Sequence, residues 1–295
     1  MDWWQAIVLG IVQGLTEFLP VSSSGHLAIG REVLGVEAAG DVTFEVAVHA
    51  ATVLATIVVF RRQIWRLLCG LFKFRYNDET DYLLKIAVSM IPVFIVGVFF
   101  KDYVEQLFGS LPVVGIALLV TALLLFLSDR GRARIPAPAG CPETLPDKPD
   151  CPEALPDTAP VRHRNGISYL QALVIGLSQA LAVIPGLSRS GTTISTGLLC
   201  GVRREDVAQF SFLMVLVPVL GEAFLDVVGG DLASSSVGAL PLLLGFVSAF
   251  VSGLLACKVM LALVRRARMK WFALYCAIVG LAVLGFVLWC IIALG

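Results

Sequence analysis

Two polar stretches interrupt otherwise apolar parts of the chain, and the first carries groups suited to acid–base chemistry. In a helix, Gln13 and Glu17 are four residues apart and therefore lie on one face. An ionisable group among apolar membrane helices is costly and indicates a functional site, so Glu17 is a candidate proton acceptor or divalent-cation ligand. Gln13 would then offer a neutral oxygen ligand beside it. For both residues, a hydrogen bond that packs helices together is the alternative role.

Serines and a histidine follow Pro20, which we expect to end the first helix of this stretch. Ser22, Ser23 and Ser24 then lie where a second helix begins, where hydroxyls cap free N–H groups and where the same N–H groups attract phosphate. His26 comes three residues after Ser23, within reach of its hydroxyl in a helix, so Ser23 is a candidate activated nucleophile. The alternatives are that His26 is itself the nucleophile, or that it is a buried histidine without a catalytic role.

The second polar stretch, PGLSRSGTT at 185–193, carries an arginine in the middle of an apolar hairpin. A guanidinium in that setting needs an anionic partner, and its planar fork fits phosphate in a bidentate way. Arg189 is therefore a candidate phosphate ligand, with a structural ion pair to Glu17 as the alternative. Ser188, Ser190 and Thr193 would add hydroxyl donors.

The elements that position these groups are expected to be membrane helices. The 295 residues are 58% hydrophobic and 15% charged, with a mean hydropathy of +0.87, whereas a soluble domain carries about 25% charged residues. The formal net charge of zero gives no overall basic surface for nucleic acid. We therefore expect an all-α polytopic membrane protein with spans at about 43–60, 83–100, 112–128, 207–229, 237–264 and 271–294.

Two further apolar regions, 3–36 and 167–200, are each broken by one of the polar stretches. Each half is only about 11–18 residues long, too short to cross a hydrocarbon core of about 30 Å. A re-entrant helix hairpin, which enters and leaves on the same side, fits both regions, because such backbone is tolerated where protein or a wet cavity surrounds it.

The two parts of the chain also match each other in sequence. GIVQ at 10–13 aligns with GLSQ at 176–179, and SSSG at 22–25 aligns with SRSG at 188–191, both at an offset of 166 residues. We therefore expect an inverted-topology repeat in which 1–128 and 167–295 each form a hairpin followed by three spans. Such repeats place a polar site near the membrane midplane, where the two breaks meet.

Basic residues predict the orientation of this layout. Most of the 22 Lys and Arg residues fall in the loops that the expected topology puts on one side. The positive-inside rule makes that side cytoplasmic. The Pro-rich linker at 129–166 is then cytoplasmic, and both termini lie outside.

Taken together, QGLTEFLPVSSSGH at 13–26 and PGLSRSGTT resemble the undecaprenyl pyrophosphate phosphatase family of the bacitracin-resistance type, over essentially the whole chain. The acidic motif of that family falls on Gln13 and Glu17, and its serine–histidine motif on Ser23 and His26. Its phosphate-binding arginine falls on Arg189. Gln13 departs from the fully acidic form and removes one candidate metal-ligand charge, and the insert at about 131–165 is atypical in length and composition.

The resemblance implies hydrolysis of undecaprenyl diphosphate to undecaprenyl phosphate and inorganic phosphate. This recycles the lipid carrier for peptidoglycan and other envelope polymers and confers bacitracin resistance. The resemblance also implies a divalent cation, Mg²⁺ or Ca²⁺, and a multi-pass protein of the bacterial plasma (inner) membrane whose site opens to the outer, periplasmic side. The expected partners are the polyprenyl diphosphate and the bilayer; the oligomeric state stays open, with a dimer among the options. A polyprenyl-phosphate transporter or flippase is the rival function, since inverted repeats of this kind are transporter architecture.

The residues and the family resemblance together predict a mechanism with a serine nucleophile and groups that neutralise the charge of the diphosphate. Ser23 attacks the terminal phosphorus and His26 handles the proton, while Arg189 and a metal held by Glu17 and Gln13 neutralise the diphosphate. The remaining predicted substrate-binding residues are Ser22, Ser24, Ser188, Ser190 and Thr193.

Overall fold

The structure, a computed structural model, describes residues 1–36, 42–73, 75–100, 103, 106–107, 110–131, 166–229, 237–266 and 269–294. Apart from its ends, the linker expected at 129–166 lies outside the described residues.

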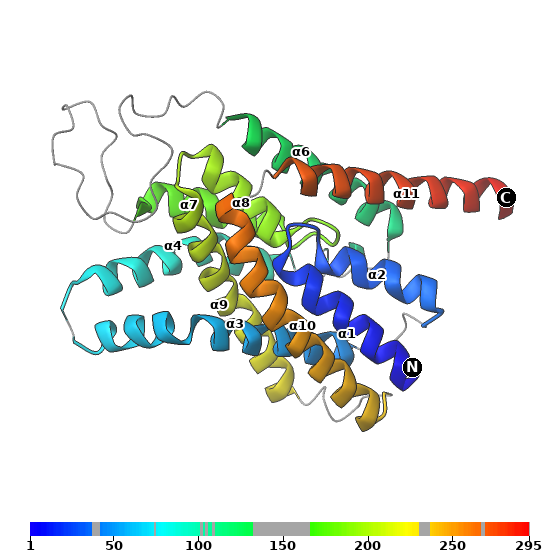
Figure 1. Ribbon diagram of the computed structural model, residues 1–295, viewed down its shortest axis with the longest axis horizontal. Coiled ribbons are helices and arrows are strands. Elements are labelled where there is room, and N and C mark those ends of the chain that lie inside the picture. Colours follow the sequence, from blue (N-terminus) through cyan, green and yellow to red (C-terminus); the bar gives the residue numbers. More distant parts are fainter. Residues whose placement is uncertain are drawn as a thin grey trace.

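Helices dominate the described part of the chain, and no strand occurs within it (Figure 1). They are α1 (Trp3–Phe18), α2 (Ser23–Leu34), α3 (Val42–Leu71), α4 (Asp78–Phe99), α6 (Leu111–Gly131), α7 (Tyr169–Leu181), α8 (Arg189–Leu199), α9 (Arg204–Gly229), α10 (Ala239–Arg266) and α11 (Lys270–Leu294). The predicted all-α class is confirmed.

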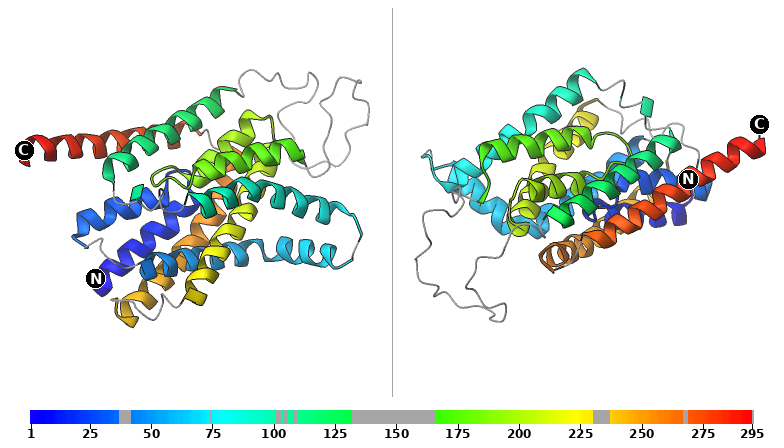
Figure 2. Two further views of the ribbon diagram at one scale, coloured as in Figure 1. Left: turned by 180° about the vertical axis from the view of Figure 1, so that it is seen from behind. Right: turned by 90° about the horizontal axis from the view of Figure 1, so that it is seen from above.

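Within the described residues, five helices are long and apolar enough to cross a membrane: α3, α4, α6, α10 and α11. The expected span at 207–229 falls in α9, where side chains from residue 222 onward lie outside the described residues. Both chain termini lie at one end of the molecule, and the connection from α3 to α4 lies at the other (Figures 1 and 2). With five helices long and apolar enough to cross a membrane within the described residues, the chain is a multi-pass membrane protein.

Local chemistry explains why the two apolar regions break where they do. Pro20 follows the end of α1, and the Ser22 hydroxyl then caps α2 by accepting a hydrogen bond from the Gly25 amide at 3.2 Å. In the second region the Ser188 hydroxyl caps α8 in the same way, accepting from the Gly191 amide at 3.1 Å. The prediction that serines cap the helix after the first break is confirmed, and the Ser188 cap of α8 adds a second example.

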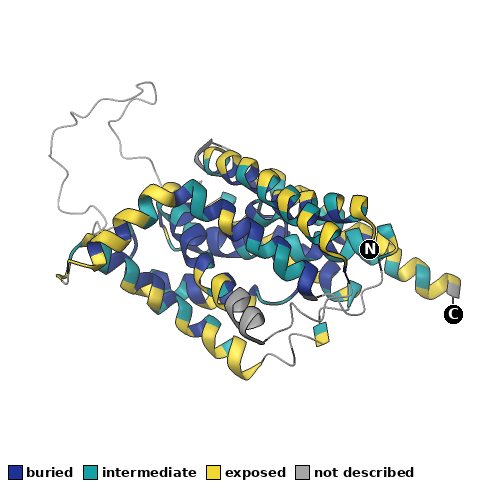
Figure 3. Cartoon of the chain, turned by 90° about the horizontal axis from the view of Figure 1, so that it is seen from below, coloured by how far each residue is buried: buried dark blue, intermediate teal, exposed yellow. Residues whose placement is uncertain are grey.

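Buried residues gather in the middle of the molecule, and exposed ones lie on the outer helices and at the ends (Figure 3). Among the inner helices, α1 packs closely against α10. Small residues allow this approach: a Cβ atom on Gly14 would lie 2.5 Å from the carbonyl oxygen of Ala249. The packing holds the first hairpin beside the long spans.

The Gly14→Ala variant should lower the stability of the folded protein by about 1–3 kcal/mol, because overpacking against α10 outweighs the small helix-propensity gain of alanine. Gly97 on α4 is the matched control, since a Cβ atom there meets nothing within 4 Å. Thermal unfolding of the purified protein in detergent should show a lower Tm for Gly14→Ala than for Gly97→Ala. Equal Tm values would contradict the close α1–α10 packing.

A buried polar cluster joins α4 to the start of α7. Lys85 donates to Asp81 at 2.6 Å, and both side chains are almost fully buried. Tyr76 and Tyr169 donate to the other carboxylate oxygen of Asp81, at 2.7 and 2.9 Å. Because a buried charge pair is costly unless its hydrogen bonds are satisfied, these contacts specify how α7 sits against α4.

Candidate functional site

The two polar breaks touch each other. The Gly186 amide donates to the Ser24 hydroxyl at 3.3 Å, and the Ser190 hydroxyl donates to the Leu19 carbonyl at 3.1 Å. A Cβ atom on Gly25 would lie 3.3 Å from the Cα atom of Gly186. Residues more than 160 positions apart in the chain therefore form one polar centre, as the sequence predicts.

Helix α6 supports the second break from behind. Gly186 has a φ of +88°, and a Cβ atom there would lie 2.6 Å from the Cα atom of Val114, so only glycine fits. The Ser188 amide donates to the Thr121 hydroxyl of α6 at 3.0 Å. These contacts place the N-terminus of α8, and with it Arg189, beside the first break.

Glu17 is the centre of the hydrogen bonds on the first hairpin. One of its carboxylate oxygens, Oε2, accepts from the Gln13 amide at 2.8 Å and from the Ser23 hydroxyl at 2.6 Å. The His49 ring of α3 lies 3.9 Å from the same oxygen, and the Glu17 side chain is only 10% exposed. The predicted pairing of Gln13 with Glu17 on one helix face is confirmed, and the carboxylate is placed to take the Ser23 proton.

His26 does not pair with Ser23, so the expectation that its ring would reach that hydroxyl is wrong in this arrangement. Nδ1 of the imidazole hydrogen-bonds to the Ser22 carbonyl at 2.8 Å, and Nε2 bonds to the Tyr275 hydroxyl at 2.7 Å. The backbone acceptor one turn earlier holds one ring nitrogen, and a side chain from α11 holds the other. The Ser23 hydroxyl therefore has the Glu17 carboxylate as its hydrogen-bond acceptor.

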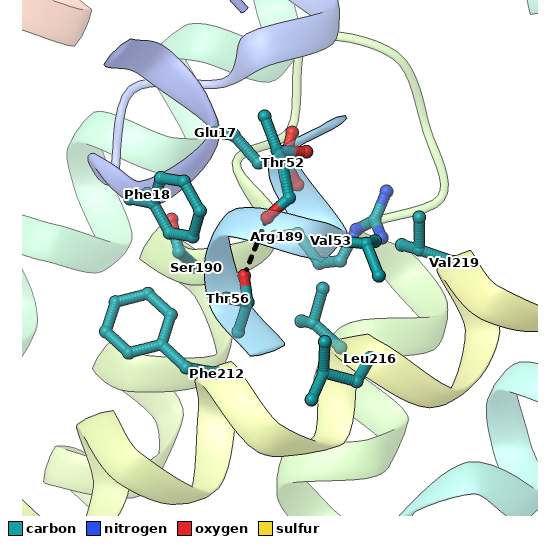
Figure 4. A pocket seen from close by; sticks show the side chains of 11 residues that line it. Glu17, Phe18, Thr52, Val53, Thr56, Arg189, Ser190, Phe212, Leu216 and Val219 are labelled. Carbon is teal, nitrogen blue, oxygen red and sulfur yellow. Dashed lines mark hydrogen bonds between the residues drawn. The ribbon is translucent and has the colours of Figure 1, made fainter. Parts of the chain in front are cut away.

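Arg189 opens α8 and is half-buried. It lines one pocket together with Glu17 and Ser190, against Thr52, Val53 and Thr56 of α3 and apolar side chains of α9 (Figure 4). Among the described residues its guanidinium makes no hydrogen bond and no ion pair. The guanidinium and the Glu17 carboxylate line the same pocket and interact electrostatically, but no ion pair within 4.0 Å joins them in this arrangement.

The other predicted substrate-binding hydroxyls all take part in holding the breaks. Ser22 and Ser188 cap helices, and Ser24 and Ser190 bridge the two breaks. The Thr193 hydroxyl donates to the Arg189 carbonyl at 2.9 Å, within its own helix. Their contact with substrate stays a prediction.

A family model for bacitracin resistance protein BacA matches residues 6–282. The chain belongs to this family. An undecaprenyl-diphosphatase of Parabacteroides distasonis is 50% identical over 285 residues, which cover 95% of this chain and 97% of the relative. One of Bacteroides thetaiotaomicron is 49% identical over 288 residues, covering 96% and 98%. An undecaprenyl-diphosphatase of Bacteroides fragilis is 47% identical over 284 residues, covering 95% and 96%.

The oxygens in this BacA-family site suit a hard cation only in part. Gln13 is buried, and its Oε1 atom has no hydrogen-bond partner, although its amide nitrogen is bound to Glu17. No group of three or more His, Cys, Asp and Glu side chains that could hold a metal occurs in the described part of the chain. Two protein oxygens fit Mg²⁺, which is commonly bound by one or two protein groups together with substrate phosphates.

Three residues of the BacA-family site were not among the predicted site residues. His49 carried a signal, because a histidine inside an apolar span is unusual, but its residue type also suits simple packing. Thr121 and Tyr275 carried none, since each is an ordinary residue in an apolar span and reaches the site only through the tertiary fold.

Proposed function

We propose that this protein hydrolyses undecaprenyl diphosphate to undecaprenyl phosphate and inorganic phosphate, and so returns the lipid carrier to cell-wall synthesis and gives resistance to bacitracin. Sequence identity of 47–50% with three undecaprenyl-diphosphatases, over nearly the full length of the chain, supports this activity. The observation that carries it is the Ser23 hydroxyl hydrogen-bonded to the Glu17 carboxylate, in contact with the break that carries the unpaired Arg189 cation.

The first chemical step is attack of the Ser23 oxygen on the terminal phosphorus. The hydroxyl proton passes to Glu17, which is already its hydrogen-bond acceptor at 2.6 Å. A serine–phosphorus bond forms as the anhydride bond to the lipid phosphate breaks, and undecaprenyl phosphate leaves with the bonding electrons. This assigns the Ser23 proton to Glu17, where the sequence alone favours His26.

Water completes the turnover. It attacks the phosphoserine, the serine oxygen takes back its proton from Glu17, and inorganic phosphate departs. His26, held between Ser22 and Tyr275, takes the proton of the attacking water and returns it to the departing phosphate. Glu17 thus handles the serine proton in both steps, and the imidazole handles the proton of the water.

Charge neutralisation comes mainly from the second break. Phosphoryl transfer needs positioning and electrostatic stabilisation more than covalent help. Arg189 offers the guanidinium fork for the terminal phosphate, and the free amides and dipole of the α8 N-terminus act in the same direction. Ser188 caps this N-terminus and Ser190 ties it to the Leu19 carbonyl, so both hold the helix end in place.

A divalent cation, Mg²⁺ or Ca²⁺, would be held by Glu17 and the unpaired Gln13 oxygen. It would neutralise the charge of the diphosphate when bound. Chelation with EDTA should therefore lower phosphate release from purified protein at least about tenfold, and added Mg²⁺ or Ca²⁺ should restore it. Unchanged release after exhaustive chelation would remove the cation from the proposal.

The membrane architecture that serves this chemistry is an inverted repeat of residues 1–128 and 167–295, each with a re-entrant hairpin. Helix lengths support it: α1 and α2 have 16 and 12 residues, and α7 and α8 have 13 and 11. None of these crosses a hydrocarbon core of about 30 Å at 1.5 Å per residue. The protein lies in the bacterial plasma membrane with the site open to the outer side and the 129–166 linker in the cytoplasm.

The deciding experiment measures inorganic phosphate released from the C55 lipid diphosphate by purified protein in detergent. Release that depends on Ser23 supports hydrolysis. Movement of polyprenyl phosphate across a vesicle membrane without phosphate release would instead support the transporter.

A further inference from the structure

Helix α11 reaches the first break through two consecutive residues. For most of its length it packs along α6. At the break, the Cys276 thiol donates to the Pro20 carbonyl at 3.5 Å, and the Tyr275 hydroxyl bonds to Nε2 of His26 at 2.7 Å. The last helix of the chain is therefore tied directly to the proposed catalytic turn.

Tyr275 also stacks on the His26 ring. The two ring centroids are 5.6 Å apart, and the ring planes differ by only 10°. One side chain thus holds a ring nitrogen while its own ring lies nearly parallel to the imidazole, which restricts the side-chain torsions of His26.

The hydrogen bonds select one tautomer of the imidazole. The Ser22 carbonyl can only accept, so Nδ1 of His26 carries a proton. In the neutral ring Nε2 is then the acceptor, and the Tyr275 hydroxyl is its donor. If Tyr275 were absent, Nε2 would lose its partner and the ring could turn away from the Ser22 carbonyl.

We propose that Tyr275 is a positioning residue that, together with the Ser22 carbonyl, holds the His26 ring in the rotamer needed for turnover. The inference rests on the proposed function, because it gives His26 a part in proton transfer. Tyr275 contacts the imidazole, whereas the Ser23 hydroxyl bonds to Glu17. Its effect therefore passes through the His26 ring.

The kinetic test compares Tyr275→Phe with Ile278→Ala in phosphate release from the C55 lipid diphosphate. Phenylalanine keeps the stacking and removes the hydroxyl, so kcat should fall about fivefold, the value of one hydrogen bond, while KM stays within about twofold. Ile278 lies one turn further along α11 with 59% of its side chain exposed, and its variant should behave as wild type. Wild-type kcat in Tyr275→Phe, or an equal loss in Ile278→Ala, would overturn the inference.

A spectroscopic test is independent of activity. In protein with ¹⁵N-labelled histidine, the His26 signals are assigned by their loss in His26→Gln and should show a protonated Nδ1 and an unprotonated Nε2. Tyr275→Phe should move the Nε2 signal, because that nitrogen loses its hydrogen-bond donor, while Nδ1 stays protonated. A wild-type ring protonated on Nε2 alone, or a pattern unchanged in Tyr275→Phe, would refute the positioning role. Absence of phosphate release by the wild type would refute the proposed function instead, and the spectra would still test the contact.

Discussion

Arg189→Ala should reduce kcat/KM for the lipid diphosphate by about 10³-fold or more, the largest loss expected at the second break. The guanidinium is half-buried and makes no hydrogen bond among the described residues, and the proposed function gives it the terminal phosphate as its anion. Removing a single preorganised donor from a developing charge commonly costs about 10²–10³ in rate, and a full bidentate cation contributes more. Steady-state phosphate release measures the effect directly.

Arg203→Ala is the matched control. It lies just beyond the same hairpin, its side chain is 68% exposed, and it pairs with Asp206 at 2.7 Å. Arg189→Lys should recover only part of the activity, because an ammonium group keeps the charge and loses the planar fork. If Arg189→Ala retained more than about a tenth of wild-type kcat/KM, phosphate binding would have to be assigned elsewhere.

Ser23→Ala should abolish turnover, with a loss of about 10³-fold or more in kcat, because the attacking atom is gone. Binding should persist, since Arg189 and the helix termini remain. Ser178→Ala is the control: that hydroxyl donates to the Ile175 carbonyl of its own helix at 2.7 Å and serves no other group. Wild-type kinetics are expected from it.

A labelled substrate separates the two candidate nucleophiles. With ³²P in the terminal phosphate, an acid quench during turnover should trap an acid-stable phosphoserine at Ser23. An acid-labile phosphohistidine that disappears in His26→Ala would transfer the nucleophilic role to His26. Glu17→Gln should retain bound substrate and form the covalent species far more slowly, because the amide cannot take the serine proton.

Local sequence signals were enough to predict some of the site. The spacing of Gln13 and Glu17 predicts their hydrogen bond, because helix geometry alone brings such residues together. The serine caps of α2 and α8 follow from residue type at a helix start. The contact between the breaks is the one that the expected internal repeat predicts.

Other features of the site depend on long-range packing and on one unusual backbone conformation. Ser22 has a φ of +71°, a left-handed conformation rare outside glycine, and no residue pattern predicts it. That conformation belongs to the turn that precedes Ser23, whose hydroxyl bonds to Glu17 and not to His26. The Tyr275 partner of His26 is 249 positions away in the chain, beyond any local pattern.

The pocket between Glu17 and Arg189 has a volume of about 20 Å³, which is room for roughly one water molecule. A diphosphate head group is several times larger, so it does not fit between these two side chains in this arrangement. A bulkier residue at Val219, on the α9 wall of the pocket, would alter admission of the lipid while leaving the chemistry of the serine untouched.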